Sequence, residues 1–234
     1  MLPERPQGQR GPLTTLVYKR RGRVGLFFVA ALSVLAGMTD AIGFLATGDF
    51  VSFMSGNTTR MAVALGDAHW ALVARLALLI GAFIAGNALG VIIARLSAKR
   101  AWPLLALSAA LLLGAGLWGA QAQLPALLGA IIAMGMLNAA VEEVNGLPIG
   151  LTYVTGALSR FGRGLGRWLM GKRRPGWRVQ LVPWSGMFGG AVLGGLLEHR
   201  YGLAALMACG GFALALAIVS LLIPRRWLRR YMAK

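Results

Sequence analysis

The residues best suited to chemistry in this chain are one acidic side chain and a nearby cluster of hydroxyls and amides. Asp40 lies inside a long apolar run, and Ser55, Gly56, Asn57 and Thr58 follow that run. A carboxylate within a membrane is costly unless it is paired, hydrated or protonated. Asp40 could therefore bind a proton or a cation, or face a substrate as a hydrogen-bonding group. The structural alternative is a cap on the segment that follows, accepting from Ser55, Asn57, Thr58 or backbone N–H groups.

The cluster Ser55-Gly56-Asn57-Thr58 has the composition of a helix N-terminus. The glycine permits a sharp turn or a close backbone approach, and Ser or Asn before a helix is a common N-cap. The N–H groups at that end carry a partial positive charge. Directed into a cavity, they suit an anionic or carbonyl-bearing substrate. Directed at the protein, they make only a well-capped helix.

A second copy of this region lies in the other half of the chain. The run GMTDA at 37–41 recurs as GMLNA at 135–139, and the stretch 52–60 recurs as 152–160. Repeats of this kind in membrane proteins place binding sites at the seam between the halves. The predicted ligand-binding residues of the second copy are the counterparts of Asp40, Ser55 and Gly56, namely Asn138, Thr155 and Gly156. Only the first copy carries a carboxylate, so the predicted site is asymmetric.

The composition is that of a membrane protein. Hydrophobic residues make up 57% of the chain, charged residues make up 13%, and the mean hydropathy is +0.68. A soluble domain would carry roughly a quarter charged residues. The apolar runs are also long enough for spans, which take about 20 residues. The predicted fold class is an all-α integral membrane protein.

The basic residues that give the net charge of +17 are clustered. Most lie before the first apolar run, after the second, between residues 160 and 178, or after the last run. This distribution is typical of the positive-inside rule and places both termini in the cytoplasm. It argues against nucleic acid as a partner and predicts contact with anionic lipid at the cytoplasmic face.

The apolar runs predict six transmembrane helices, at about 24–46, 71–95, 102–121, 124–145, 181–198 and 202–223. A helix over 52–66 would reach only about 22 Å, short of the hydrocarbon core of about 30 Å. We therefore expect 52–66 and its copy 152–166 to be re-entrant, broken or interfacial segments. Three spans in each half make a 3+3 inverted repeat. The predicted domains are a disordered cytoplasmic tail (1–23), membrane repeat 1 (24–121), membrane repeat 2 (122–224) and a basic cytoplasmic tail (225–234).

Sequence signatures of catalysis are missing from the chain. His69 and His199 are far apart, and no metal-ligand cluster, glycine-rich phosphate loop or nucleophile–base arrangement is evident. We therefore predict that the protein is not an enzyme and needs no cofactor or metal.

The run AGMTDAIGF at 36–44, followed by Phe50 and by MSGNT at 54–58, resembles the signature of the YoaK-like family. These are small, uncharacterised bacterial inner-membrane proteins that share a domain of unknown function. In that family a Gly-x-x-Asp-Ala block precedes a Met-Thr-Gly-Asn-Thr block, and here Ser55 replaces the usual Thr and keeps the hydroxyl. The resemblance covers about residues 23–223. It implies a multi-pass protein of the bacterial inner (plasma) membrane and implies nothing about the substrate.

Two functions fit these observations. The first is a secondary transporter or channel for a small molecule or ion, with proton coupling through Asp40 as one form of it. The second is a non-transporting scaffold or regulatory subunit, whose basic cytoplasmic loop 160–178 docks a partner or anionic lipid. With three spans in each half, a homodimer is compatible with either function.

Overall fold

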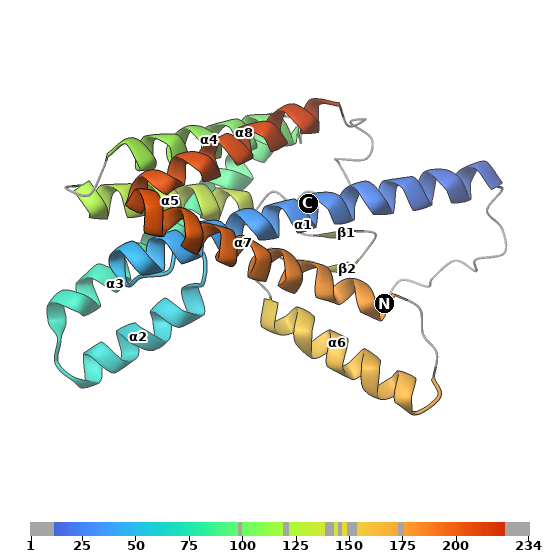
Figure 1. The fold of residues 1–234 in the computed structure, drawn as a ribbon, viewed down its shortest axis with the longest axis horizontal. Coiled ribbons are helices and arrows are strands. Elements are labelled where there is room, and N and C mark those ends of the chain that lie inside the picture. Colours follow the sequence, from blue (N-terminus) through green and yellow to red (C-terminus); the bar gives the residue numbers. More distant parts are fainter. Residues whose placement is uncertain are drawn as a thin grey trace.

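A computed structural model of the chain describes residues 12–97, 100–118, 122–138, 143–144, 147–148, 154–172 and 176–222. The described residues are almost wholly helical (Figure 1). The helices are α1 Pro12–Thr47, α2 Met54–Gly66, α3 Trp70–Leu96, α4 Ala101–Leu117, α5 Gln123–Asn138, α6 Val154–Leu169, α7 Leu181–Tyr201 and α8 Leu206–Leu221. Two 3-10 turns, η3 Trp177–Gln180 and η4 Gly202–Ala205, precede α7 and α8.

The helices have the length and surface of membrane helices. Residues 22–47, 70–96 and 177–221 form helical stretches long and apolar enough to cross a bilayer, and the last of these comprises α7 and α8 joined by η4. The apolar helices α4 and α5 are shorter. Large apolar side chains are exposed along α3, α7 and α8, including Ile84, Phe188 and Ile218. An apolar exterior of this extent is typical of a surface that contacts lipid, and the predicted class of helical membrane protein is confirmed.

Two sequence-based boundaries were wrong. The helix α1 begins at Pro12, so residues 12–23 are helical, although they were expected to belong to a disordered tail. A proline suits the first position of a helix. No further proline occurs between Pro12 and the end of α1. The helix α5 ends at Asn138, whereas the fourth span was expected to continue to residue 145.

A short hairpin follows α5 in place of the predicted helix. The strands β1 Glu143–Val144 and β2 Leu147–Pro148 pair antiparallel, with Glu143 opposite Pro148. The sequence between the strands is Asn-Gly, the dipeptide that favours a two-residue hairpin turn. A proline also disfavours continuation of a helix.

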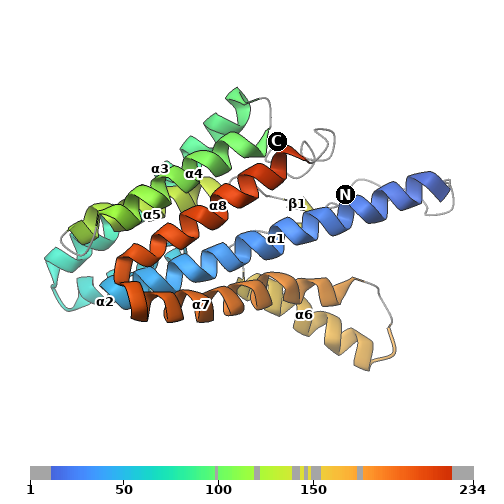
Figure 2. The same cartoon turned by 45° about the horizontal axis from the view of Figure 1, so that its top comes forward.

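The helices pack in pairs. The most extensive contacts join α1 to α7, α4 to α8 and α3 to α5, and α4 also packs on α5 (Figures 1 and 2). The two short helices lie at the edge of this bundle, where α2 contacts α3 and α6 contacts η3 and α7. Figure 1 shows α2 and α6 diverging below the bundle, α2 toward the left and α6 toward the right.

Glycines allow α1 and α7 to approach until backbone meets backbone. Gly190 of α7 lies against the carbonyl group of Val34 in α1, and Gly37 of α1 lies against the carbonyl group of Met187. One turn further along, a Cβ atom added at Gly194 would lie 2.5 Å from the carbonyl oxygen of Met38. Small residues at four-residue spacing permit this close packing of membrane helices.

The pair formed by α3 and α5 repeats this arrangement. A Cβ atom at Gly86 of α3 would lie 2.5 Å from the Ile132 carbonyl oxygen, and one at Gly135 of α5 would lie 2.6 Å from the Phe83 carbonyl oxygen. The helix that carries Asp40 and the helix that carries Asn138 are therefore both held by glycine contacts to the backbone of a neighbour.

We expect Gly190→Ala to lower the melting temperature of the purified protein, because the methyl group meets the backbone of Val34 rather than a movable side chain. Overpacking of this kind costs about 1–3 kcal/mol. The adjacent Gly189→Ala is the matched control, because nothing lies within 4 Å of a Cβ atom at Gly189 and alanine is the better helix former by up to about 1 kcal/mol. Equal melting temperatures for the two variants would contradict the packing of α1 on α7.

Candidate functional site

The site begins where α1 ends. Gly48 adopts φ +78° just after the helix, and its N–H donates to the carbonyl of Phe44 at 2.8 Å. A left-handed residue at this position is a common helix terminator, and glycine adopts that conformation without strain. Residues 48–53 then run back along α1 before α2 begins at Met54. This connection, the 48–53 turn, brings Ser52 and Phe53 to Asp40.

Asp40 accepts three hydrogen bonds from the 48–53 turn. The Ser52 N–H donates to Oδ1 of Asp40 at 2.5 Å, the Ser52 hydroxyl donates to Oδ2 at 2.5 Å, and the Phe53 N–H donates to Oδ1 at 3.3 Å. The Asp40 side chain and Ser52 are both buried. The carboxylate therefore satisfies backbone donors ahead of α2, which is the capping role set out above, although Ser52 supplies the hydroxyl and Ser55, Asn57 and Thr58 do not.

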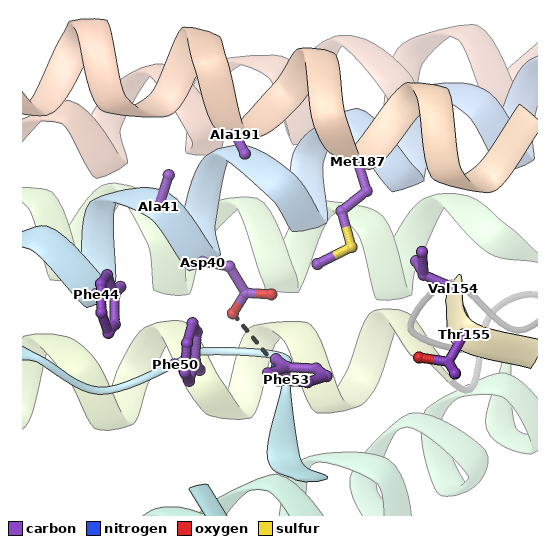
Figure 3. A pocket seen from close by; sticks show the side chains of 9 residues that line it. All are labelled: Asp40, Ala41, Phe44, Phe50, Phe53, Val154, Thr155, Met187 and Ala191. Atoms are coloured by element: carbon purple, nitrogen blue, oxygen red, sulfur yellow. Dashed lines mark hydrogen bonds between the residues drawn. The ribbon is translucent and has the colours of Figure 1, made fainter. Parts of the chain in front are cut away.

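The same carboxylate faces a cavity of about 320 Å³. Residues of the first half line one side of it: Asp40, Ala41, Phe44, Phe50 and Phe53. Residues of the second half line the other side: Val154, Thr155, Met187 and Ala191. Figure 3 shows the Asp40 carboxylate between Phe53 and Met187, with Thr155 beyond them. The cavity thus lies among α1, α7, the 48–53 turn and the start of α6.

Three phenylalanine rings form the wall of the cavity on the side of the 48–53 turn. The Phe44 and Phe50 rings are stacked with their centroids 4.8 Å apart, and Phe50 meets Phe53 edge to face at 5.2 Å. Phe44 and Phe53 are 45% and 38% exposed, so the cavity reaches the surface between them. Gly56 makes room for this arrangement, because a Cβ atom there would lie 2.5 Å from the Phe53 ring.

The cluster predicted in the first half, residues 55–58, does not line the cavity. The Asn57 side chain is fully buried and is occupied by Phe50, whose N–H donates to Oδ1 at 3.1 Å and whose carbonyl accepts from Nδ2 at 2.7 Å. Ser55 and Thr58 are exposed on α2, and the Thr58 hydroxyl donates to the Met54 carbonyl at 2.8 Å. Asn57 therefore positions Phe50, and Phe50 lines the cavity.

The second copy contributes one of its three predicted residues. Thr155 lines the cavity at the start of α6, whereas the neighbouring Gly156 lies beside the Arg160 guanidinium. Asn138, the counterpart of Asp40, donates to Oδ1 of Asn87 at 3.2 Å. Of the eight predicted site residues, the structure brings Asp40 and Thr155 together at the cavity.

Sequence reasoning missed a buried charge next to the site. Asp49 of the 48–53 turn is 1% exposed and binds Arg60 of α2 at 2.5 Å and Arg75 of α3 at 2.7 Å. The signal available in the sequence was that Arg60 and Arg75 lie outside the basic clusters, where an arginine needs a partner. This cluster of Asp49, Arg60 and Arg75, the arginine clasp, ties the turn to both α2 and α3.

The geometry suits binding rather than catalysis or metal coordination. Within the described residues there is no group of three or more His, Cys, Asp or Glu side chains able to hold a metal ion. The polar groups that the lining residues present are the Asp40 carboxylate and the Thr155 hydroxyl, and the remaining side chains are apolar. A largely apolar cavity with a few placed polar groups is the usual form of a small-molecule site.

Comparisons with known proteins agree with the membrane character and give no activity. A family model described as "Protein of unknown function (DUF1275)" matches residues 28–219. A protein of Rhizobium meliloti (strain 1021), described as UPF0700 transmembrane protein RA0705, is 52% identical over 216 residues, which cover 92% of this chain and 95% of that protein. No solved structure matches the chain.

We expect Asn57→Ala to destabilise the protein, because it leaves the N–H and the carbonyl of Phe50 without their partners. Each buried backbone group that loses its hydrogen bond costs about 1–3 kcal/mol. Thr58→Ala is the control, since it removes one exposed hydroxyl from the same helix. Thermal unfolding in detergent should separate the two variants. If both melted like the wild type, the role given to Asn57 would be wrong.

We expect Asp49→Asn to lower the melting temperature, because two guanidinium groups lose their shared carboxylate and α2 loosens from α3. Hydrogen bonds to charged groups contribute about 1.5–3 kcal/mol each when largely buried. Glu198→Gln makes the same change of charge at a residue whose ion pair with His199 is 3.9 Å long. A loss of stability as large in Glu198→Gln as in Asp49→Asn would count against the arginine clasp.

Proposed function

Because the chain belongs to DUF1275, a family of proteins of unknown function, we propose its activity from its geometry: a transporter or channel that moves a small solute through the cavity at Asp40. The resemblance noted in the sequence agrees with this membership. The membrane location follows from the apolar helices and from the transmembrane relative. The transport activity is the step that we add.

The observation that carries the proposal is the position of the cavity between the starts of the two short helices. Phe53 directly precedes α2, and Val154 and Thr155 are the first residues of α6. From this point α2 and α6 diverge, α2 toward the lower left and α6 toward the lower right of Figure 1. Broken helices that begin at a shared central cavity are a recurring feature of transporter sites.

The glycine contacts support an internal two-fold relation between the halves. The sequence offset between Gly37 and Gly135 is the same as that between Val34 and Ile132. The sequence offset between Met187 and Phe83 is likewise the same as that between Gly190 and Gly86. The two helix contacts are therefore made by residues at corresponding positions. These are Gly37, Val34, Met187 and Gly190 in the contact of α1 with α7, and Gly135, Ile132, Phe83 and Gly86 in the contact of α5 with α3. With three predicted spans in each half, the proposed arrangement is a 3+3 inverted repeat.

The two helix contacts differ at the position that matters for transport. At the same sequence offset that relates Gly190 to Gly86, the counterpart of Ala191 is Asn87. Where α1 meets α7, Asp40 and Ala191 line an open cavity, whereas where α5 meets α3 the counterparts Asn138 and Asn87 are joined by a hydrogen bond. This supports a state in which the seam is open on one side and closed on the other, as alternating access requires.

Proton coupling through Asp40 is part of the proposal. The ion pairs of the described residues involve Asp49 and Glu198, and none of them involves Asp40. A carboxylate in the membrane without a cation is stabilised when it takes up a proton. We place both termini in the cytoplasm and the protein in the bacterial inner membrane, in keeping with the positive-inside rule.

A membrane-docking function is the second candidate, and α6 is the observation that favours it. This helix exposes Arg163 and Arg167 together with the apolar side chains of Trp168 and Leu169. A basic amphipathic helix of this type lies at the membrane interface and binds anionic lipid. Such a helix also fits a transporter, so flux is the property that separates the two functions.

The test is solute flux in proteoliposomes, with a panel of labelled amino acids, organic acids and organic cations and with a proton gradient imposed in either direction. We expect at least one solute to move with the wild type. We expect Asp40→Asn to lower its initial rate by about tenfold or more, since a buried charge contributes several kcal/mol to the site. Protein-free liposomes give the background rate.

Asp67→Asn is the matched control for charge, because Asp67 is exposed in the turn after α2 and away from the cavity. It should transport like the wild type. Absence of flux for every solute, with folded protein in the liposomes, would reject transport and leave the membrane-docking function. Equal rates in Asp40→Asn and the wild type would reject the role given to Asp40.

A further inference from the structure

We propose that the cavity binds a hydrophobic organic cation, with a monovalent ammonium or related head group paired to Asp40 and an apolar body against the phenylalanine wall. This deepens the proposed function and rests on it for the passage of the ligand through the membrane. The binding itself is argued from the cavity alone.

The charge of the ligand follows from the charges around the cavity. Asp40 receives hydrogen bonds from Ser52 and Phe53, all of them from neutral donors. Arg60 of α2 and Arg75 of α3 are bound to Asp49. The described lining therefore holds one acidic side chain and no basic one. A cation complements this charge, whereas an anion would meet like charge in a place with little water.

The apolar body of the ligand follows from the lining. Phe44, Phe50 and Phe53 form one wall, and Met187 lies opposite them (Figure 3). Aromatic faces attract a cation through their quadrupole, and a methionine side chain adapts to an irregular apolar surface. The volume of about 320 Å³ is at the lower end of the range for small-molecule sites. The fit is to one aromatic ring with a compact charged head.

The same lining disfavours the other classes of solute. A hard metal cation needs about six oxygen ligands, and the cavity presents the Asp40 carboxylate and the Thr155 hydroxyl. A sugar or an amino acid carries several polar groups that would lose water without finding partners here. A helix N-terminus suits an anion, but beside α2 the carboxylate of Asp40 already takes that position.

The experiment is a thermal-shift titration of the purified full-length protein with three probes that share a benzyl group: benzyltrimethylammonium, benzyl alcohol and phenylacetate. A ligand that binds the native state raises the melting temperature as its concentration rises. We expect benzyltrimethylammonium to give a saturable rise in the millimolar range or below, and the neutral and anionic probes to give none. An equal rise with benzyl alcohol, or no rise with the cation, would overturn the inference.

Three variants locate the site. Asp40→Asn removes the charge and should raise the apparent Kd for the cation by about tenfold or more, while Asp67→Asn should leave it unchanged. Ala191→Leu fills the cavity from α7 and leaves the hydrogen bonds of Asp40 in place, so it should abolish the rise even if Asp40→Asn does not fold. A cation response that survives in Ala191→Leu would overturn the inference.

The two proposals fail separately. Cation binding that depends on Asp40 and Ala191, without flux of any solute in proteoliposomes, would support the site and reject transport. Flux of another solute that depends on Asp40, without cation binding, would support transport and reject the ligand class proposed here.

Discussion

The hydrogen bonds between Asp40 and the 48–53 turn are the interaction on which the rest of the site depends. They hold the chain against α1 after it has reversed direction at Gly48, and they give the buried N–H group of Ser52 the partner that it needs. The position of the turn then fixes where α2 begins, where the phenylalanine wall stands and where Asp49 meets its two arginines. One carboxylate therefore shapes the cavity and also faces into it.

This double role creates a physical conflict that a transporter can use. A carboxylate bound by three donors is stabilised in its charged form, whereas its burial in an apolar surrounding opposes that charge. A proton or an organic cation that reaches Asp40 changes this balance and with it the strength of the contacts to the 48–53 turn. Under the proposed function, binding at the cavity is coupled to the position of α2, because the same side chain takes part in both.

The fold class and the main helices could be predicted from the sequence, since apolar runs and basic clusters encode membrane helices and their flanks directly. The ends of elements could not. Residues 12–23 are too polar to be recognised as an extension of an apolar helix, and the hairpin after Asn138 lies in a stretch that was taken for the end of a span. In both places the local sequence is compatible with more than one state, and the tertiary setting decides between them.

Two residues singled out in the sequence, Asp40 and Thr155, line the cavity, whereas its apolar walls were not predicted. The reason lies in how polar residues are used in a membrane. A polar side chain there must find a partner, and the partner can be backbone as easily as ligand. Asn57 satisfies the main chain of Phe50, and Thr58 satisfies its own helix, so neither is free for a solute. Most of the residues that line the cavity are apolar. In a chain that is mostly apolar, their residue types do not mark them in the sequence as part of a site. Asp40 is the exception, because it is the acidic side chain of the described lining, and the cation selectivity that we propose rests on its charge.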